Sequence, residues 1–183
     1  MLMNIYVIRH CEATGQSEDA PLTARGIKQA ESLADSLRGA DIERVICSPY
    51  LRARQTIEPY VKRHNIPVTL ERRLSERILS GSNLDNWLEC LRQTFDDFDL
   101  SFDGGESSRV AMGRAVGVIR DIESSDSKCI AIVTHGNLMT LLLRHFDARF
   151  GFDEWASLTN PDVFLVTGDE SKCVVERMLT EQI

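Results

Sequence analysis

The chain has 183 residues, a formal net charge of −7, 43% hydrophobic residues and 27% charged residues. This length suits one domain with a sizeable core, and the composition excludes a largely disordered chain. The acidic balance argues against binding along a nucleic-acid backbone, which requires a basic surface. A basic pocket in such a chain would therefore indicate a small anionic ligand.

The apolar N-terminal stretch reaches Arg9 within a few residues, which makes it too short for a signal peptide. No segment of the chain approaches the ~20 apolar residues that a membrane span needs. The five cysteines are scattered and include no CxxC pair, which indicates reduced thiols rather than a disulfide framework or a zinc site. We therefore expect a cytoplasmic protein with no membrane partner.

Strands and helices alternate along the first 70 residues. Apolar residues at helical spacing predict a helix that follows an N-cap at Thr23 and stops at Gly39. A second helix is expected from Pro49 to about Arg63, since proline is tolerated in the first turn. Short β-rich apolar runs predict three strands, of which the first two are expected to be buried. These runs span residues 4–8, 44–48 and 66–70.

The second half of the chain begins with a less regular segment. Residues 77–105 hold one expected helix, around 84–95, and an acidic, aromatic stretch, and we expect this segment to form a lid over the substrate. Further on, patterns predict a helix from Glu106 to about Ile122, a strand at 129–134 and a very apolar helix at 136–146. The tail then holds two β-rich runs joined by "GDES", which predicts a hairpin.

This alternation predicts a single α/β domain over residues 1–183. We expect three layers, with a mostly parallel central sheet, one antiparallel edge strand and helices on both faces of the sheet.

Three of the predicted strands end in polar residues directly before a helix. The first ends at Arg9-His10, the second at Ser48, and a later one at Thr134-His135. Ligands of a parallel sheet bind at the carboxyl ends of its strands, where the loops turn into helices. We therefore expect these residues, distant in the sequence, to meet at one rim of the sheet.

The helix after Ser48 opens with Arg52 and Arg54, which adds positive charge to this rim. A helix N-terminus already favours anions, and the planar fork of arginine suits phosphate. The basic pair Arg9-His10 is therefore expected to face a phosphoryl group.

His10 and Cys11 are the two candidate nucleophiles at the first strand end. A cysteine phosphatase needs a Cys-x5-Arg loop, and none of the five cysteines has an arginine six residues later. A neutral imidazole, with an unperturbed pKa of about 6.5, is available near pH 7 and can form a covalent phosphoryl intermediate. Histidine is therefore the better nucleophile.

Five motifs together resemble the histidine phosphatase superfamily, the phosphoglycerate-mutase-like proteins. The resemblance covers nearly the whole chain in the family's order and approximate spacing. Each motif alone is weak, but five in register are specific. The motifs are "VIRHCEATGQ", "LTARGIKQAESLADSL", "ICSPYLRARQT", "GGES" and "VTHGNL".

The resemblance implies a role for each matching position. The histidine of the RH motif is phosphorylated in that family, which corresponds to His10. The preceding arginine, Arg9, binds the phosphate, as does the arginine that corresponds to Arg52 rather than Arg54. The histidine of the later HG motif, His135, completes the phosphate pocket.

Two further roles and one departure follow from the same resemblance. A glutamate after the third strand protonates the leaving group, and here it corresponds to Glu76. Gln16 stands where relatives have an asparagine that contacts the phosphoryl group. Cys11 departs from the family, which usually has glycine there; it predicts an ordinary φ at this position and suggests a thiol whose oxidation inactivates the enzyme.

The expected function is a phosphomonoesterase that acts on a small phosphorylated metabolite through a phosphohistidine. No metal and no cofactor are expected, because the arginines supply the positive charge. One alternative is a cofactor-dependent phosphoglycerate mutase, although mutases usually have longer chains. Another is a protein phosphohistidine phosphatase, although these are typically smaller and lack much of a lid. A non-catalytic phosphate-binding regulatory domain is the third. The sequence leaves the oligomeric state open.

Overall fold

The structure, a computed structural model, describes residues 3–169 and 172–178, which form a six-stranded sheet in the order β3-β2-β4-β1-β5-β6. Strands β1 to β4 run parallel, β5 is antiparallel to β1, and β6 is antiparallel to β5. The predicted α/β class is therefore confirmed, and the β5–β6 hairpin forms one edge of the sheet. Residues 170 and 171 of the expected "GDES" turn lie outside the described residues. The strands are β1 (Met3–Arg9), β2 (Arg44–Cys47), β3 (Val68–Leu70), β4 (Cys129–Thr134), β5 (Asp162–Asp169) and β6 (Lys172–Arg177).

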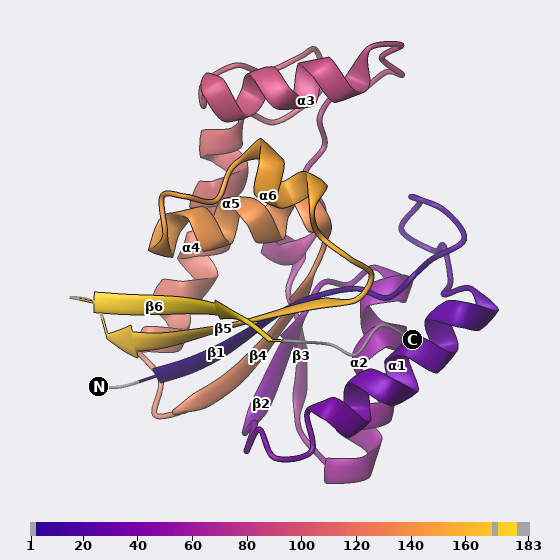
Figure 1. The fold of residues 1–183 in the computed structure, drawn as a ribbon, viewed down its shortest axis with the longest axis vertical. Helices are drawn as coiled ribbons and strands as arrows, with labels where there is room; N and C mark the ends of the chain where they lie inside the picture. The colour runs from indigo at the N-terminus through magenta and orange to yellow at the C-terminus, as the bar shows by residue number, and fades with distance from the viewer. Residues whose placement is uncertain (1–2, 170–171, 179–183) are drawn as a thin grey trace.

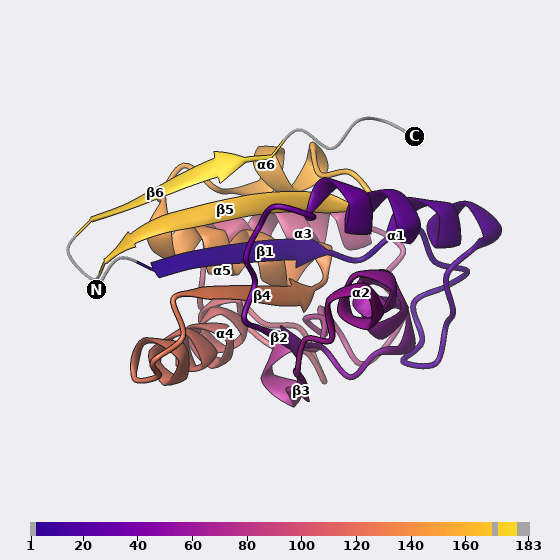
Figure 2. The same cartoon turned by 90° about the horizontal axis from the view of Figure 1, so that it is seen from below.

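Helices cover both faces of the sheet, as expected. Figures 1 and 2 show α1 and α2 together on one side of the sheet and α4 and α5 on the other. None of the helices in the described part of the chain is long and apolar enough to cross a membrane. The helices are α1 (Ala24–Ser36), α2 (Leu51–His64), α3 (Trp87–Asp96), α4 (Ser108–Glu123), α5 (Gly136–Phe146) and α6 (Phe152–Ala156), with a 3₁₀ turn, η1 (Arg72–Leu74).

All six residues of the central strand β4 are buried. The sheet therefore needs a layer of helices on each of its two faces. Ile130 and Ile132 pack in one apolar cluster with residues of α4 and α5. Ala131 and Val133 pack in a second cluster with residues of α1 and α2. Successive side chains of a strand point to opposite faces, so a strand buried on both faces must be apolar throughout.

Local signals place most helix starts correctly. The hydroxyl of Thr23 accepts the N–H of Gly26, and the hydroxyl of Ser107 accepts the N–H of Val110, which makes both residues N-caps. Helix α2 begins at Leu51, two residues after the proline that was expected to open it. Helix α6 was not predicted, because its five residues are too few for a periodic pattern.

Helix α3 lies at the end of the molecule farthest from the sheet, above α4, α5 and α6 (Figure 1). Leu91 and Phe95 of α3 are buried in the α4–α5 cluster. The ring of Phe95 lies 6.3 Å from the ring of Phe152 in α6, measured between centroids. Helix α3 therefore packs on the layer that carries α5 and not on the sheet. That residues 77–105 act as a lid stays a prediction.

Candidate active site

The register of the sheet brings the polar strand ends together. Arg9 at the end of β1 is paired with Thr134 at the end of β4, and β2 lies on the other side of β4. The next residues along β1 and β4, His10 and His135, have ring centroids 5.2 Å apart. The hydroxyl of Ser48, which follows β2, lies 2.8 Å from Nε2 of His135. The structure thus gathers the predicted rim residues at one place.

His10 is held as the tautomer that a nucleophile needs. Its Nδ1 lies 2.7 Å from the carbonyl oxygen of Cys11, which only accepts, so Nδ1 carries the proton. Arg52 Nε, which only donates, lies 3.2 Å from His10 Nε2. Nε2 therefore presents a lone pair. The pKa of His10 is lowered to about 4, mainly because burial desolvates the ring; the hydrogen bond to Cys11 opposes this shift, and the positive charges of Arg52 and Arg9 add to it.

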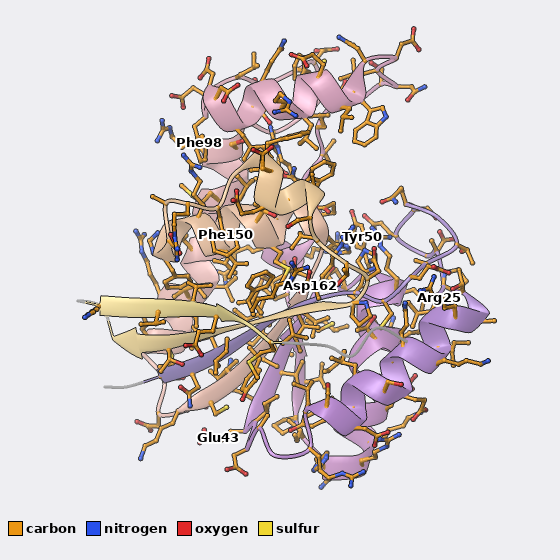
Figure 3. The ribbon with its side chains drawn as sticks, in the orientation of Figure 1. Arg25, Glu43, Tyr50, Phe98, Phe150 and Asp162 are labelled. Atoms are coloured by element: carbon orange, nitrogen blue, oxygen red, sulfur yellow. The ribbon has the colours of Figure 1, made fainter. Side chains whose placement is uncertain are left out.

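Arg52 is the arginine of α2 that reaches this histidine, while Arg54 points to solvent. The guanidinium of Arg52 is buried, and its Nη1 donates to the carbonyl oxygens of Gln16 and Ser17 at 3.1 and 2.7 Å. It also lies 4.9 Å from the centre of the Tyr50 ring. Figure 3 shows Tyr50 near the start of α2, and its ring centroid lies 4.8 Å from that of His135. These contacts fix a buried positive charge beside His10.

Arg9 supplies a second guanidinium to the same rim. Its Nη1 donates to the carbonyl oxygens of Leu158 and Thr159, both at 3.2 Å. Its Nε is buried and has no hydrogen-bond partner among the residues that the structure describes. A Cβ at Gly136 would lie only 3.0 Å from this Nε, so any larger residue there would have to displace the Arg9 side chain slightly. The free Nε–H is available to a ligand.

Asn137 was missed by the sequence analysis, although it directly follows the HG pair at the start of α5. Asn137 is 7% exposed, and neither its side-chain nitrogen nor its side-chain oxygen has a hydrogen-bond partner in the described part of the chain. Nδ1 of His135 is likewise buried without a partner. Buried polar groups are normally hydrogen-bonded. Unpartnered atoms on Arg9, His135 and Asn137 therefore make this rim the candidate site for a polar ligand.

Glu76 reaches the same rim from the loop after η1. Its Oε1 accepts the N–H groups of Arg77 and Leu138, at 2.8 and 3.0 Å, and its Oε2 accepts the N–H of Asn137 at 3.1 Å. The carboxyl group therefore caps the N-terminus of α5, next to His135.

The loop that carries Glu76 is itself fixed by Arg114 of α4. The Arg114 Nη1 donates to the carbonyl oxygens of Arg73 and Ser75, at 2.6 and 2.9 Å. The other two nitrogens of the guanidinium bind both carboxylate oxygens of Glu106, at 2.8 and 2.9 Å. A bidentate pair of this kind adds geometric precision, so the position of Glu76 depends on a residue far away in the sequence.

Gln16 and Cys11 differ from the other predicted site residues. The side chain of Gln16 is exposed, while its carbonyl oxygen accepts from Arg52; a contact with phosphate stays a prediction. Cys11 is not among the non-glycine residues with positive φ in the described chain, as expected. Its side chain is fully buried, and desolvation raises the pKa of its thiol to about 12. Because the thiolate is the reactive form, the structure disfavours the expected oxidation of Cys11.

Within residues 3–169 and 172–178, no group of three or more histidine, cysteine, aspartate or glutamate residues is arranged to hold a metal ion. The charge at the rim comes from arginines.

A comparison with protein families identifies the chain. The model of the histidine phosphatase superfamily (branch 1) matches residues 5–180. The chain belongs to this superfamily. Its expected family and fold are therefore confirmed.

Curated relatives are named as phosphatases and as a mutase. A probable phosphatase of Schizosaccharomyces pombe is 28% identical over 185 residues, covering 92% of this chain and 63% of that relative. The chain therefore spans a little under two thirds of that protein. The probable phosphoglycerate mutase GpmB of Proteus mirabilis is 26% identical over 159 residues, covering 79% of this chain and 70% of that protein.

Solved structures share the fold of this histidine phosphatase superfamily member. A mycobacterial glucosyl-3-phosphoglycerate phosphatase has a TM-score of 0.78 at 18% identity, covering 97% of this chain and 98% of its own. A phosphoglycerate mutase of Bacillus anthracis has a TM-score of 0.79 at 20% identity, covering 97% and 92%. Phosphatases and mutases thus have this fold in common, so the fold alone does not separate them.

The lowered pKa of His10 predicts how stability changes with pH in this family member. Between the unfolded pKa of about 6.5 and the folded pKa of about 4, the unfolded chain binds more protons, so the free energy of unfolding falls as the pH falls. The shift corresponds to a loss of about 3 kcal/mol below this window. Urea unfolding at about pH 7.5 and about pH 4.5 measures it. Between these two pH values, a His10→Gln variant should lose less stability than the wild type, by most of that amount. Equal losses in the two proteins would contradict the buried, neutral imidazole.

Proposed function

We propose that the chain is a phosphomonoesterase that hydrolyses a small phosphorylated metabolite through a phosphohistidine on His10. The observation that carries the proposal is the lone pair of His10 Nε2, fixed by Cys11 and Arg52 in a buried basic site. A neutral imidazole with this orientation is prepared for attack and needs no base to remove a proton from it. Membership of the superfamily supports the same reaction.

In the first step, the phosphoryl group lies against Arg9, Arg52 and His135. Nε2 of His10 donates its lone pair to phosphorus, and the bond from phosphorus to the leaving oxygen breaks. Arg52 Nε exchanges His10 for a phosphoryl oxygen as the phosphorus–nitrogen bond forms. The two guanidinium groups stabilise the negative charge on the equatorial oxygens of the transition state. They supply the charge that a metal ion supplies elsewhere.

Glu76 serves as the acid for the leaving oxygen. A carboxyl group has about four lone-pair positions, and three N–H groups use three of them here. Oε2 accepts only from Asn137, which leaves a position on this oxygen for the proton. In the second step, Glu76 takes a proton from water, the water oxygen bonds to phosphorus, and the phosphorus–nitrogen bond breaks. His10 Nε2 regains its lone pair.

Residues 77–105 offer few cations for a second anionic group, which favours hydrolysis over phosphoglycerate mutation. This segment has two arginines and no lysine. Arg77 is buried and donates from two nitrogens to the carbonyl oxygen of Glu106. The guanidinium of Arg92 lies 3.9 Å from the centre of the Phe152 ring. Arg77 is therefore not free for a second anionic group such as the carboxylate of a phosphoglycerate, and Arg92, which is half-exposed, already lies 3.8 Å from the carboxylate of Asp153.

The same segment offers apolar surface instead. Ile78, Trp87 and Leu88 are 51%, 50% and 47% exposed. The acidic residues of segment 77–105 repel a second negative charge on the substrate, and its exposed apolar side chains favour an uncharged organic group. We therefore propose that the lid accepts a leaving group with few charges.

A direct assay separates the alternatives. With EDTA present, we expect hydrolysis of p-nitrophenyl phosphate, and a kcat/KM for uncharged esters at least about tenfold above that for 3-phosphoglycerate. Isomerisation of 3-phosphoglycerate that requires the 2,3-bisphosphate would support a mutase instead. Binding of inorganic phosphate without turnover of any ester would support a regulatory domain.

A further inference from the structure

Ser48 forms a hydrogen bond with His135 that the proposed reaction does not explain. The two side chains are each 0% exposed, and Ser48 Oγ lies 2.8 Å from His135 Nε2. Ser48 directly follows β2, and His135 is the N-cap position of α5. The bond therefore links two of the strand ends that form the rim.

The surroundings of Ser48 determine which group donates. The backbone N–H of Tyr50 donates to Ser48 Oγ at 3.3 Å, so this oxygen already accepts one hydrogen bond. The hydroxyl has one proton to donate, and in the described part of the chain His135 Nε2 is the acceptor in reach. If His135 donated instead, the hydroxyl proton would be buried without an acceptor, which is costly. Hydrogen-bond satisfaction thus assigns Ser48 as donor and Nε2 as acceptor.

This direction fixes where the ring carries its proton. Desolvation by burial lowers the pKa of His135 well below its usual range, and the nearby His10, Arg52 and Arg9 add to that effect. A neutral imidazole has one N–H, and with Nε2 accepting, that hydrogen is on Nδ1. Nδ1 is the buried ring nitrogen of His135 that has no partner within residues 3–169 and 172–178.

We propose that Ser48 is a positioning residue that holds His135 as the Nδ1–H tautomer, so that this N–H donates to the phosphoryl group. The phosphoryl contact rests on the proposed function, whereas the tautomer itself does not. In the opposite tautomer Nδ1 would direct a lone pair at an anion, which is repulsive. His10 and His135 then both carry the proton on Nδ1. His10 directs the lone pair of Nε2 at the phosphoryl group, whereas His135 directs its Nδ1–H at it.

Nitrogen-15 NMR of histidine-labelled protein tests the tautomer without any assay of activity. In the wild type, the His135 signals, assigned by their loss in His135→Gln, should show a protonated Nδ1 and an unprotonated Nε2. Ser48→Ala should shift them towards the Nε2–H pattern and lower kcat/KM about 10- to 100-fold. Ser48→Thr, which keeps the hydroxyl, should keep the wild-type pattern.

Thr140→Val provides the matched control, because Thr140 is also a fully buried hydroxyl, bonded to the carbonyl oxygen of Gly136 at 2.9 Å. It should leave the tautomer and kcat/KM unchanged. A wild-type His135 with its proton on Nε2 would overturn the proposal, and this measurement requires no variant of Ser48 to fold. A Ser48→Ala protein with the wild-type tautomer and rate would overturn it too. Absence of all phosphatase activity in the wild type would count against the proposed function and leave the tautomer measurement valid.

Discussion

Replacement of His10 by glutamine is expected to lower kcat/KM for p-nitrophenyl phosphate by at least about 10⁴-fold and to abolish the covalent phosphoenzyme. An amide nitrogen has no lone pair for attack on phosphorus, while its size keeps the buried site filled. The two arginines would still bind phosphate, so affinity for inorganic phosphate should survive. Rapid quenching with phosphorus-32-labelled ester into alkali, where phosphohistidine persists, measures the intermediate.

His145→Gln is the control for this substitution. His145 lies in α5 but is exposed to solvent, and its ring contacts Phe146 rather than the rim. It should show the same labelling and rate as the wild type. Labelled protein in the His10→Gln variant at wild-type amounts would mean that phosphate is carried by another residue.

The rim could be predicted from the sequence because it depends on the sheet. Parallel strands end on the same side, so polar residues that follow β1, β2 and β4 have to meet. Apolar runs predict these strands clearly. The positions of Arg9, His10 and His135 at the strand ends follow from this prediction. Helices α1, α4 and α5 were predictable as well, because each buries a continuous face and therefore has a clear pattern of apolar residues in the sequence.

The contacts that hold the rim residues were not predictable in this way. Whether Ser48 donates to His135 depends on the backbone N–H of Tyr50. The position of Glu76 depends on Arg114, in a different helix. The Arg114–Ser75 and Ser48–His135 contacts connect residues 39 and 87 positions apart and leave no periodic pattern in the sequence. Asn137 was missed for a related reason: burial of both its polar atoms is visible only when the helix is packed.

The cysteine beside His10 illustrates the same limit. Its place next to the nucleophile suggested a reactive thiol, because the sequence gives proximity but not accessibility. In the fold, Cys11 packs in a small apolar cluster with Leu22 and Ala30. The thiol therefore substitutes for a small apolar side chain there, and its chemistry is suppressed by desolvation.

Replacement of Glu76 by glutamine is expected to have an effect that depends on the leaving group. For an alkyl phosphate, whose leaving alkoxide needs a proton, kcat/KM should fall about 10²- to 10⁴-fold. For p-nitrophenyl phosphate, whose phenolate leaves without help, the fall should be about tenfold or less. The measured quantity has to be kcat/KM, because it reports the formation of the phosphohistidine and excludes the later step in which Glu76 activates water.

This dependence separates catalysis from structure at a residue that does both. Glu76 caps α5, and a glutamine would turn an amide N–H towards the N–H of Asn137 or Leu138, which disturbs the cap. A disturbed rim slows both esters by the same factor, whereas a missing acid slows the alkyl ester far more. Glu12→Gln, a carboxylate beside Cys11 whose Oε1 accepts from the Thr23 hydroxyl, is the control and should show no such difference. Equal losses for the two esters in Glu76→Gln would assign this glutamate to the helix cap and leave the leaving group without its proposed acid.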